Sequence, residues 1–442
     1  MSKIIGVDTS NIDNVSGFFV TQGGGGSIED FALTEADTGV LMWGGGAGAQ
    51  DVLKIKVDGN VIIPSAVPSK GQLTTATISK GNFKFGGFGS AYLTDSGDLY
   101  TCWPSAVFTS SIGRAVTASA PQDEYHLAAQ NVANFFVGYG GIMYVSTSGT
   151  FHHSGNGAYF GNSGTTANYS FAQIGSDTDW VSIHGDPYPY YGSTVYIAVK
   201  GSNGGKLYVI GSNSEGKTGL NTTSGLTSSW TLMSDGTASG TFDVEGWTDI
   251  KVMSDSPGAI DSTGRLWRWG ENAYGALGTG TSTDILYPQQ VGNDTDWEYL
   301  GPTRNVMMAI KGGEIWYCSS GNYGSPFGTG LTFDRTWRQL TSTGGLWEEI
   351  DANDGMAQNY VYTGKYNGGY VVYSSNPAIY GSHNLPSNSS LNGISNGIGG
   401  TRFVDISDLA NPIDSGSTIN WIHSYCGNNS SDATFLLIRA SS

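Results

Sequence analysis

The chain has 442 residues and a formal net charge of −17, and only 13% of its residues are charged. Its 20 Lys and Arg residues form no cluster, which argues against nucleic acid and anionic membranes as partners because both require clustered basic groups. No apolar run approaches the roughly 18 residues of a membrane span, and the N-terminus lacks the regions of a signal peptide, so we expect neither membrane insertion nor secretory export.

The first twenty residues read as a short apolar arm. Lys3–Val7 (KIIGV) recurs eleven residues later as Asn14–Phe18 (NVSGF), and the glycine-rich stretch Thr21–Ser27 has the composition of a flexible linker. The arm could be a frayed tail or an extra strand on the rim of the fold. We favour an anchoring peg, because its apolar side chains require a partner surface. These side chains are Ile4, Ile5, Val7, Ile12, Val15, Phe18 and Phe19.

The arm resembles the openings of many bacteriophage tail and virion proteins, in which Ile-x-Gly-Val and Val-x-Gly-Val units are joined by polar spacers. The resemblance implies a virion component, assembled in the host cytoplasm, that binds other virion proteins through the arm. We therefore expect two parts, the arm with its linker over residues 1–35 and a repeat domain over residues 36–442.

A repeated glycine organises the rest of the chain. It recurs at intervals of 49 to 59 residues, and each copy has a Leu, Phe, Ile or Val two positions later. Such a period, with a turn glycine before an aromatic and aliphatic segment, is typical of propeller blades. The glycines are Gly39, Gly97, Gly149, Gly205, Gly264, Gly313 and Gly369.

One aromatic residue recurs in each repeat unit, with the same period as these glycines, and is predicted to lead into an apolar strand. Two of these aromatics follow nearly the same sequence, Gly175–Trp180 (GSDTDW) and Gly292–Trp297 (GNDTDW). Each unit is then predicted to contain four strands. A tight hairpin is expected at the glycine, because glycine adopts positive φ without steric cost. The aromatics are Phe83, Phe135, Trp180, Trp247, Trp297, Trp347 and Trp421.

The clearest copy of the repeat is Asp261–Gly280 (DSTGRLWRWGENAYGALGTG). It is similar to the regulator of chromosome condensation repeat family, whose blades follow Gly-x-Val/Leu-Tyr-x-Trp-Gly-x-Asn-x-x-Gly-x-Leu-Gly-x-Gly. Residues 313–330 and 205–219 are recognisable copies, and the other units keep only the skeleton. The resemblance implies an all-β, seven-bladed β-propeller of four-stranded blades. The founding member's chromatin contact and exchange activity find no support in this acidic chain.

The two ends of the chain are expected to complete one blade. The repeats begin in mid-unit with the strand Gly39–Trp43, and they finish with the other half, Trp421–His423 and Ala433–Arg439. A composite blade of N- and C-terminal strands would close the ring and remove open sheet edges.

Two insertions are the main candidates for exposed loops. His184–Gly192 (HGDPYPYYG) lengthens its unit, and its prolines stiffen it, so Tyr188, Tyr190 and Tyr191 could form a platform for glycan or protein, or could cap the hydrophobic end of the ring. The second insertion, Asn376–Ile406, reads as a long surface loop.

The sequence offers no catalytic constellation, cofactor motif or metal site. The histidines lack ligand spacing, and His152 occupies a strand position held elsewhere by Tyr or Trp, which favours packing. Gly44–Gly48 has no Lys-Ser/Thr ending and therefore does not predict a phosphate cradle. The histidines are His126, His152, His153, His184, His383 and His423.

The cysteines and the recurring aspartates both favour structural roles. Cys102 and Cys318 share the repeat position that Trp269 holds in the clearest copy, so we expect buried, inert thiols there; Cys426 is the third cysteine. Four aspartates recur before the leading tryptophans, which favours Asx turns over calcium binding. They are Asp177, Asp179, Asp294 and Asp296.

The sequence as a whole predicts a non-enzymatic virion structural or attachment protein of a bacteriophage, from the tail or another virion surface, that contacts other virion proteins and a host-surface glycan or protein. A soluble binding or inhibitory propeller of cellular origin is the main alternative. A glycan-cleaving propeller is a third, and it would require carboxylates gathered at the centre of the ring.

Overall fold

The structure is a computed structural model of the whole chain. It describes residues 40–46, 52–57, 60–62, 72–73, 83–86, 89–94, 96–103, 122–138, 141–156, 167–186, 195–202, 204–223, 225–238, 240–252, 255–273, 275–301, 307–318, 335–340, 345, 347–352, 361–366, 369–374, 403–405, 421–429 and 432–439.

The described residues are almost entirely β-strands and turns. The one helical segment among them is the short 3-10 helix η5 (Ser214–Gly216). No helix in this part of the chain has the length and hydrophobicity needed to cross a bilayer.

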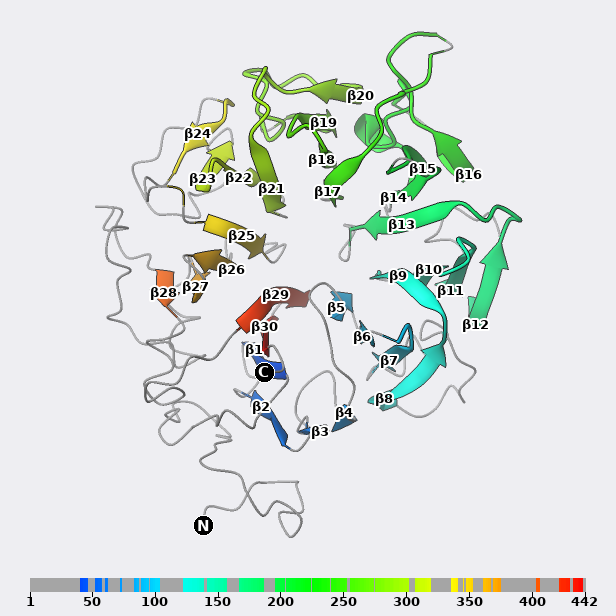
Figure 1. Cartoon of the computed structure of the whole chain (residues 1–442). Coiled ribbons are helices and arrows are strands. Elements are labelled where there is room, and N and C mark those ends of the chain that lie inside the picture. The colour runs from blue at the N-terminus through cyan, green and yellow to red at the C-terminus, as the bar shows by residue number, and fades with distance from the viewer. Residues whose placement is uncertain are drawn as a thin grey trace.

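The described strands form seven antiparallel sheets, six of four strands and one of six. Their innermost strands, β5, β9, β13, β17, β21, β25 and β29, surround a common centre (Figure 1). This arrangement is a β-propeller.

The four-stranded sheets comprise β5 (Phe83–Gly86), β6 (Gly89–Leu93), β7 (Leu99–Trp103) and β8 (Gln122–Ala129); β9 (Val132–Val137), β10 (Gly141–Ser146), β11 (Phe151–Asn156) and β12 (Ala167–Ile174); β13 (Trp180–Gly185), β14 (Val195–Lys200), β15 (Lys206–Ser212) and β16 (Leu226–Leu232); β17 (Trp247–Lys251), β18 (Gly258–Asp261), β19 (Leu266–Gly270) and β20 (Ile285–Gln290); β21 (Trp297–Gly301), β22 (Met307–Lys311), β23 (Glu314–Cys318) and β24 (Arg338–Gln339); and β25 (Trp347–Ala352), β26 (Val361–Tyr366), β27 (Gly369–Ser374) and β28 (Phe403–Asp405).

The six-stranded sheet joins the two ends of the chain. Its order is β29 (Trp421–Asn429), β30 (Asp432–Arg439), β1 (Val40–Gly46), β2 (Val52–Val57), β3 (Asn60–Ile62) and β4 (Gln72–Leu73). The predicted pairing of the chain ends is therefore present, with β1 hydrogen-bonded to β30 from Val40↔Ile438 to Gly46↔Asp432. The sheet differs from the prediction in size, because β3 and β4 extend it beyond four strands.

The turn glycines and the leading aromatics recur with the same period because the two are hydrogen-bonded across neighbouring sheets. The carbonyl of Gly149 accepts the backbone N–H of Trp180 at 3.1 Å, and the carbonyl of Gly264 accepts that of Trp297 at 3.2 Å. Both glycines have φ of +76°. At both of these boundaries the hairpin turn thus holds the first residue of the following sheet, which explains why the spacing between glycine and aromatic is repeated there.

The predicted aromatic marker is wrong at Phe135. The residue that bonds to the preceding turn is Val132, whose N–H donates to the Gly97 carbonyl at 2.9 Å, as Trp180 does to Gly149. The pairing of β9 with β10 also shifts at Val132 in the way that β13 shifts at Trp180. Phe135 lies three residues after Val132 and is also buried. An aromatic ring can be buried at either position, so burial does not identify the first residue of the strand.

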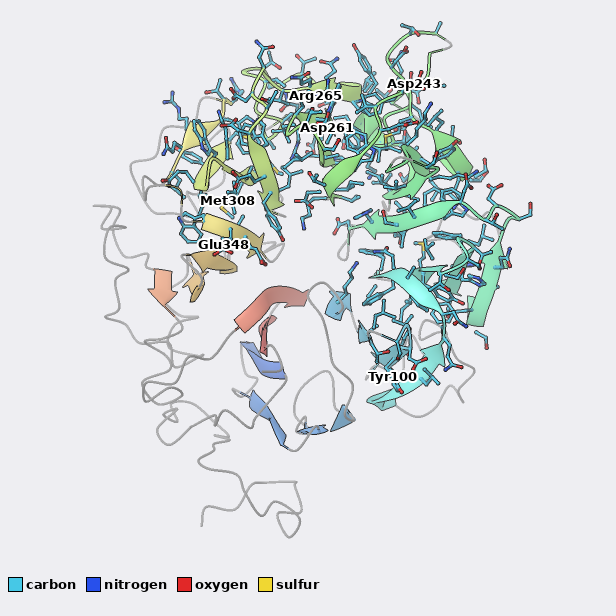
Figure 2. The ribbon with its side chains drawn as sticks, in the orientation of Figure 1. Tyr100, Asp243, Asp261, Arg265, Met308 and Glu348 are labelled. Carbon is cyan, nitrogen blue, oxygen red and sulfur yellow. The ribbon has the colours of Figure 1, made fainter. Side chains whose placement is uncertain are left out.

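The hydrophobic core lies between neighbouring sheets, where side chains fill the spaces shown in Figure 2. One cluster joins the sheet β13–β16 to the sheet β17–β20, with Ile197, Leu207 and Val209 packed with Ile250 and Trp269. Burying one such side chain stabilises the fold by roughly 1.5 to 3 kcal/mol. Similar clusters join the consecutive sheets from β5–β8 to β21–β24, so these sheets depend on one another.

Polar side chains also link the innermost strands. The Asn134 Oδ1 accepts the backbone N–H of Ile183 at 2.9 Å, and the Asp249 Oδ2 accepts that of Leu300 at 2.7 Å. In both cases the acceptor lies two residues after the residue that begins its strand, and the donor lies on the next sheet. Buried backbone N–H groups are thereby satisfied across sheet boundaries.

Candidate functional site

Two loops of equivalent structure lie at the junction of the sheets β13–β16 and β17–β20. They are residues 213–221, after β15, and residues 271–273 and 275–280, after β19. The Asn272 Oδ1 accepts the backbone N–H of Leu277 at 3.1 Å, and the Asn213 Oδ1 accepts that of Thr218 at 3.2 Å. Both asparagines are buried. The Asn of the repeat pattern is therefore the residue that fixes the loop.

Close backbone contact brings the second loop against the β17–β18 connection. Gly270 has φ of +93°, and a Cβ there would collide with the carbonyl of Asp255. The N–H of Glu271 donates to that same carbonyl at 2.7 Å, and the Ser256 hydroxyl donates to the Glu271 carbonyl at 2.7 Å. Glycine at position 270 thus allows Asp255 and Glu271 to lie side by side.

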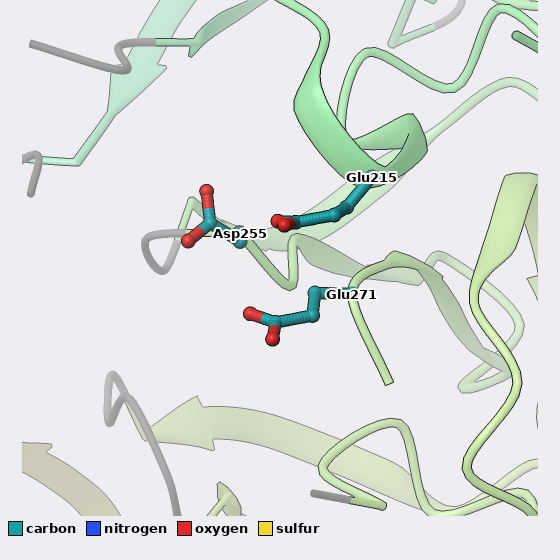
Figure 3. Close-up of side chains that lie close together, drawn as sticks. All are labelled: Glu215, Asp255 and Glu271. Carbon is teal, nitrogen blue, oxygen red and sulfur yellow. The ribbon is translucent and has the colours of Figure 1, made fainter. Parts of the chain in front are cut away.

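Three carboxylates meet at this junction. Glu215, Asp255 and Glu271 each offer an oxygen within 4.8 Å of the others, and their side chains lie close together (Figure 3). Glu215 is exposed and sits in η5 with φ of +59°, a left-handed conformation that is uncommon outside glycine. We call this group the acidic junction.

A buried lysine balances part of its charge. The Lys217 Nζ lies 2.7 Å from the Asp255 Oδ1, and the Lys217 side chain is fully buried. Burial raises the pKa of Glu215, and the Asp255 carboxylate adds to this, while Lys217 opposes it. The three carboxylates therefore keep a net negative charge around a single ammonium.

The acidic junction suits a cationic group better than a metal ion. Calcium takes six to eight oxygen ligands, and here one of the three carboxylates already binds the ammonium of Lys217. Glu215 is the exposed carboxylate of the three. The group could not be found from the sequence because its members come from two sheets and share no motif.

A second buried cation lies beside the junction. Arg268 on β19 is fully buried, and its Nη2 donates to the Ser256 carbonyl at 2.9 Å. Burial lowers the pKa of Arg268 to about 10, partly offset by Cys318. The thiol of Cys318 is free and buried, its Sγ donates to the Ala276 carbonyl at 3.2 Å, and burial raises its pKa to about 12. Cys318 thus has the inert, packed environment that its repeat position predicts.

Three of the innermost strands carry basic residues whose charges act on one another. They are Lys84 on β5, His184 on β13 and Lys251 on β17. His184 was expected to begin a surface insertion, but it and Gly185 are the last residues of β13. Local sequence does not show which strand end faces the centre, so this group too was missed.

The aspartates before the leading tryptophans bind lysines. Asp177 lies 2.7 Å from Lys200, and Asp294 lies 2.7 Å from Lys311. Asp179 and Asp296 approach the same two ammonium groups at 3.7 and 4.0 Å. Their recurrence reflects a structural role, as expected, but among the described contacts this role is an ion pair to a lysine on the second strand of the following sheet rather than an Asx turn.

The remaining predicted site residues divide into two groups. His152 is partly buried, stacks on Tyr144 with ring centroids 4.6 Å apart, and hydrogen-bonds to Thr150 Oγ1. The arm residues and the loop tyrosines lie outside the described residues, and they stay predictions. These are Ile4, Ile5, Val7, Ile12, Val15, Phe18, Phe19, Tyr188, Tyr190 and Tyr191.

One repeat family matches part of the sequence. The regulator of chromosome condensation (RCC1) repeat model matches residues 263–305. No curated protein matches the sequence.

Solved structures match over most of the chain. Human WBSCR16 is similar with a TM-score of 0.60 and 15% identity, covering 91% of this chain and 99% of its own. Prp20p from Saccharomyces cerevisiae is similar with a TM-score of 0.55 and 12% identity, covering 93% and 94%. Yeast RCC1 (Prp20) bound to Kap60 gives 0.54 and 10%, covering 96% and 95%. The chain therefore has an RCC1-like β-propeller fold.

Proposed function

We propose that this chain is a non-enzymatic binding protein that holds a basic segment of a protein partner against the acidic junction. The observation that carries the proposal is the net negative charge of Glu215, Asp255 and Glu271. Glu215 and Glu271 lie on the two loops that Asn213 and Asn272 hold rigid, and Asp255 lies in the adjoining β17–β18 connection. Rigid loops on a stable scaffold are common binding elements, and complementary charge speeds and orients association.

The structural neighbours support a protein partner. Prp20p is described with binding to Gsp1p and histones, and yeast RCC1 (Prp20) is described bound to Kap60. These are properties of the yeast protein, and the likeness to this chain is one of fold. They make protein binding a reasonable use of an RCC1-like propeller here.

A charge-reversal variant tests this proposal. Glu215→Lys should abolish capture of the partner from cells that produce the protein, because the exposed carboxylate becomes an ammonium beside Lys217. Asp243→Lys is the matched control, since Asp243 is an exposed carboxylate paired with Lys206 away from the junction. Capture of the same proteins in equal amounts by the wild type and by Glu215→Lys would refute the proposal.

We further propose that the ring has seven blades and closes through the sheet that contains both chain ends. The support is the pairing of β1 with β30 and of β30 with β29, together with the six other sheets around the same centre. The arrangement leaves β29 as the innermost strand of the closing blade, like β5 and β25 in its neighbours.

The biological setting we propose is a bacteriophage virion, with the chain anchored through residues 1–20. The support is the apolar arm, which precedes a propeller of low charge content. Light scattering on the full chain and on a chain that starts at Ser27 separates this setting from a soluble cellular binder. An anchoring arm predicts assembly of the full chain and a monomer without the arm, whereas a soluble binder predicts identical monomers.

A glycan-cleaving propeller receives less support. Its carboxylates would gather at the ring centre, but the described residues place the acidic junction in loops between two sheets and place Lys84 and Lys251 near the centre. Asp249, which is also near the centre, accepts the N–H of Leu300 and lies 3.5 Å from Lys251.

A further inference from the structure

The ion pair between Lys217 and Asp255 differs from the other described ion pairs in its burial. The Lys217 side chain is fully buried, whereas the lysine side chains of the other pairs are 15 to 33% exposed. Its Nζ lies 2.7 Å from the Oδ1 of Asp255, whose side chain is 18% exposed. Both partners of this contact are therefore poorly hydrated.

The backbones that carry the two side chains are each held by a hydrogen bond from a different part of the chain. The Lys217 carbonyl accepts the Nε1 of the fully buried Trp269 at 3.0 Å. The Asp255 carbonyl accepts the N–H of Glu271 at 2.7 Å, and the Ser256 hydroxyl donates to the Glu271 carbonyl at 2.7 Å. The amine and the carboxyl are thus kept in contact, which removes much of the entropic cost of a reaction between them.

A buried contact of this kind can react in a way that a surface ion pair cannot. Transfer of one proton from the ammonium to the carboxylate leaves two neutral groups, which a poorly hydrated site favours over two charges. The neutral amine of a desolvated lysine is a nucleophile. The carbon it would attack, Cγ of Asp255, is bonded to the oxygen that Nζ of Lys217 already contacts.

A neighbouring carboxyl can move the protons of such a reaction. An oxygen of Glu215 lies within 4.8 Å of one of Asp255. Burial raises the pKa of Glu215, and the charge of Asp255 adds to this, so Glu215 carries a proton more readily than an ordinary surface glutamate. A protonated Glu215 can donate to the carboxyl oxygen of Asp255 during the attack, and its carboxylate can then accept a proton from the attacking nitrogen.

We propose that Lys217 and Asp255 join in an intramolecular isopeptide bond. The neutral Nζ attacks Cγ of the protonated carboxyl, the C–N bond forms and the C–O bond to the hydroxyl breaks. The nitrogen gives up one hydrogen as a proton, which leaves with the hydroxyl as one water molecule. The bond ties the loop after β15 to the β17–β18 connection and so links two sheets covalently. It removes one positive and one negative group together, so the net charge of the acidic junction is unchanged, and it does not rest on the proposed function.

Mass spectrometry of the denatured full chain tests the bond. The wild type should be lighter than its sequence mass by one water molecule, whereas Lys217→Arg, which keeps the charge but lacks the amine, should show no such loss. In a tryptic digest the wild type should resist cleavage after Lys217 and give a branched peptide that contains Asp255. The exposed pair of Lys206 and Asp243, at 2.6 Å, is the control within the same molecule and should give ordinary linear peptides.

Two further variants test the chemistry. Asp255→Asn should still form the bond but lose ammonia in place of water, and Glu215→Gln should leave most of the chain at its full mass. A wild type at its full sequence mass would overturn the proposal, as would a loss of water that persists in Lys217→Arg. Complete linkage in Glu215→Gln would overturn the role given to Glu215. Because the bond is measured in the wild type, a variant that does not fold leaves this result intact.

Discussion

Asp261 closes the hairpin of the clearest repeat. Its carboxylate accepts the backbone N–H of Thr263 at 2.9 Å, the Arg265 Nε at 2.7 Å and the Trp267 Nε1 at 2.8 Å. Thr94 and Ser146 take the same place in their hairpins, three residues before the turn glycine, and their hydroxyls accept the N–H groups of Asp98 and Thr150. These three hairpins thus share a small acceptor at this position.

Asp261→Ala should lower the free energy of unfolding by about 3 kcal/mol, because it leaves buried donors without an acceptor. Urea denaturation at pH 7 measures the loss. Asp243→Ala, at an exposed carboxylate on the outer loop of the neighbouring sheet (Figure 2), should leave stability nearly unchanged. Equal effects of the two substitutions would contradict the role assigned to the Asp261 hydrogen bonds.

The same residue should make the fold sensitive to acid. Burial alone would raise the pKa of Asp261, but the hydrogen bonds from Thr263, Trp267 and Arg265 outweigh it and lower the pKa. The folded state therefore holds this proton less tightly than the unfolded state. Its contribution is present above the unfolded pKa of about 3.9 and is lost as pH falls through the lower folded value. The stability difference between the wild type and Asp261→Ala should shrink over that range.

Single positions show where local sequence is informative and where it is not. Trp180 and Trp297 were found from their repeated neighbours, and the structure places them at strand starts. Lys200 and Lys311, which bind the preceding aspartates, were not found, since each lies on the following strand of its sheet. Their role depends on strand pairing, which a single sequence does not contain.

At the scale of elements, the hairpin of each sheet is the contact point for the next. Gly264 turns the hairpin between β18 and β19, and the segment before Trp297 passes so close that a Cβ on Gly264 would collide with the Thr295 carbonyl. Gly149 and Thr178 repeat this contact two sheet boundaries earlier. Glycine is therefore required at the turn for two reasons: its φ is positive, and a neighbouring sheet lies too close for a Cβ.

The variants Gly264→Ala and Gly292→Ala should separate the effect of positive φ from the effect of the close contact between sheets. Gly292 also has positive φ, 66°, but a Cβ there would meet no atom within 4 Å. We expect Gly292→Ala to cost about 1 kcal/mol of stability through backbone strain alone, and Gly264→Ala to cost about 3 kcal/mol because the clash adds to the strain. Thermal unfolding of both variants is the measurement, and equal losses would mean that the contact between sheets is unimportant.

Lys311, at the end of β22, contacts β21, β23 and the segment that precedes β21. The Lys311 Nζ lies 4.4 Å from the centroid of Trp316 and 5.3 Å from that of Trp297, and it binds Asp294. Lys311→Met should cost about 1 kcal/mol, since it keeps the apolar stem and loses the cation.

A double-mutant cycle with Asp294→Asn isolates the ion pair within that loss. The coupling should be about 0.5 kcal/mol and should fall with added salt, because Asp294 is half exposed. A coupling that equals the whole effect of Lys311→Met would leave no contribution for the aromatic rings.

The elements also show the limit of periodicity as a guide. The turn glycines were predicted, and Gly97, Gly149, Gly205, Gly264 and Gly313 all have positive φ. The register of β9 was not predicted correctly, because Phe135 is aromatic and buried like the tryptophans that begin other strands. Hydrophobic pattern indicates that a strand exists, whereas the contacts to the previous hairpin determine where it starts.

At the scale of the whole molecule, β30 holds the chain ends together. It lies between β29 and β1, and removing it would leave two strands without a shared partner. The sequence predicted this pairing because each end held half of a repeat. It did not predict the six-stranded sheet, since β3 and β4 follow no repeat marker.

Deletion of residues 433–442, which removes nearly all of β30, should destabilise the whole ring rather than a single sheet. We expect a drop in Tm for the entire cooperative transition, followed by calorimetry and by tryptophan fluorescence, because the consecutive sheets from β9–β12 to β21–β24 share core clusters. Deletion of residues 440–442, after β30, is the control and should have no effect. An unchanged Tm in the longer deletion would contradict a closed ring.

The register of β1 against β30 has a mechanical consequence. Val40 pairs with Ile438 at one end of the ladder, so the chain enters β1 and leaves β30 at that same end. Antiparallel hydrogen bonds lie perpendicular to the strands, and tension between the N- and C-terminal segments would load them one pair at a time, like a zipper. A pull on the two termini would open the molecule at low force, whereas a load shared between loops of different sheets would meet the packed interfaces all at once.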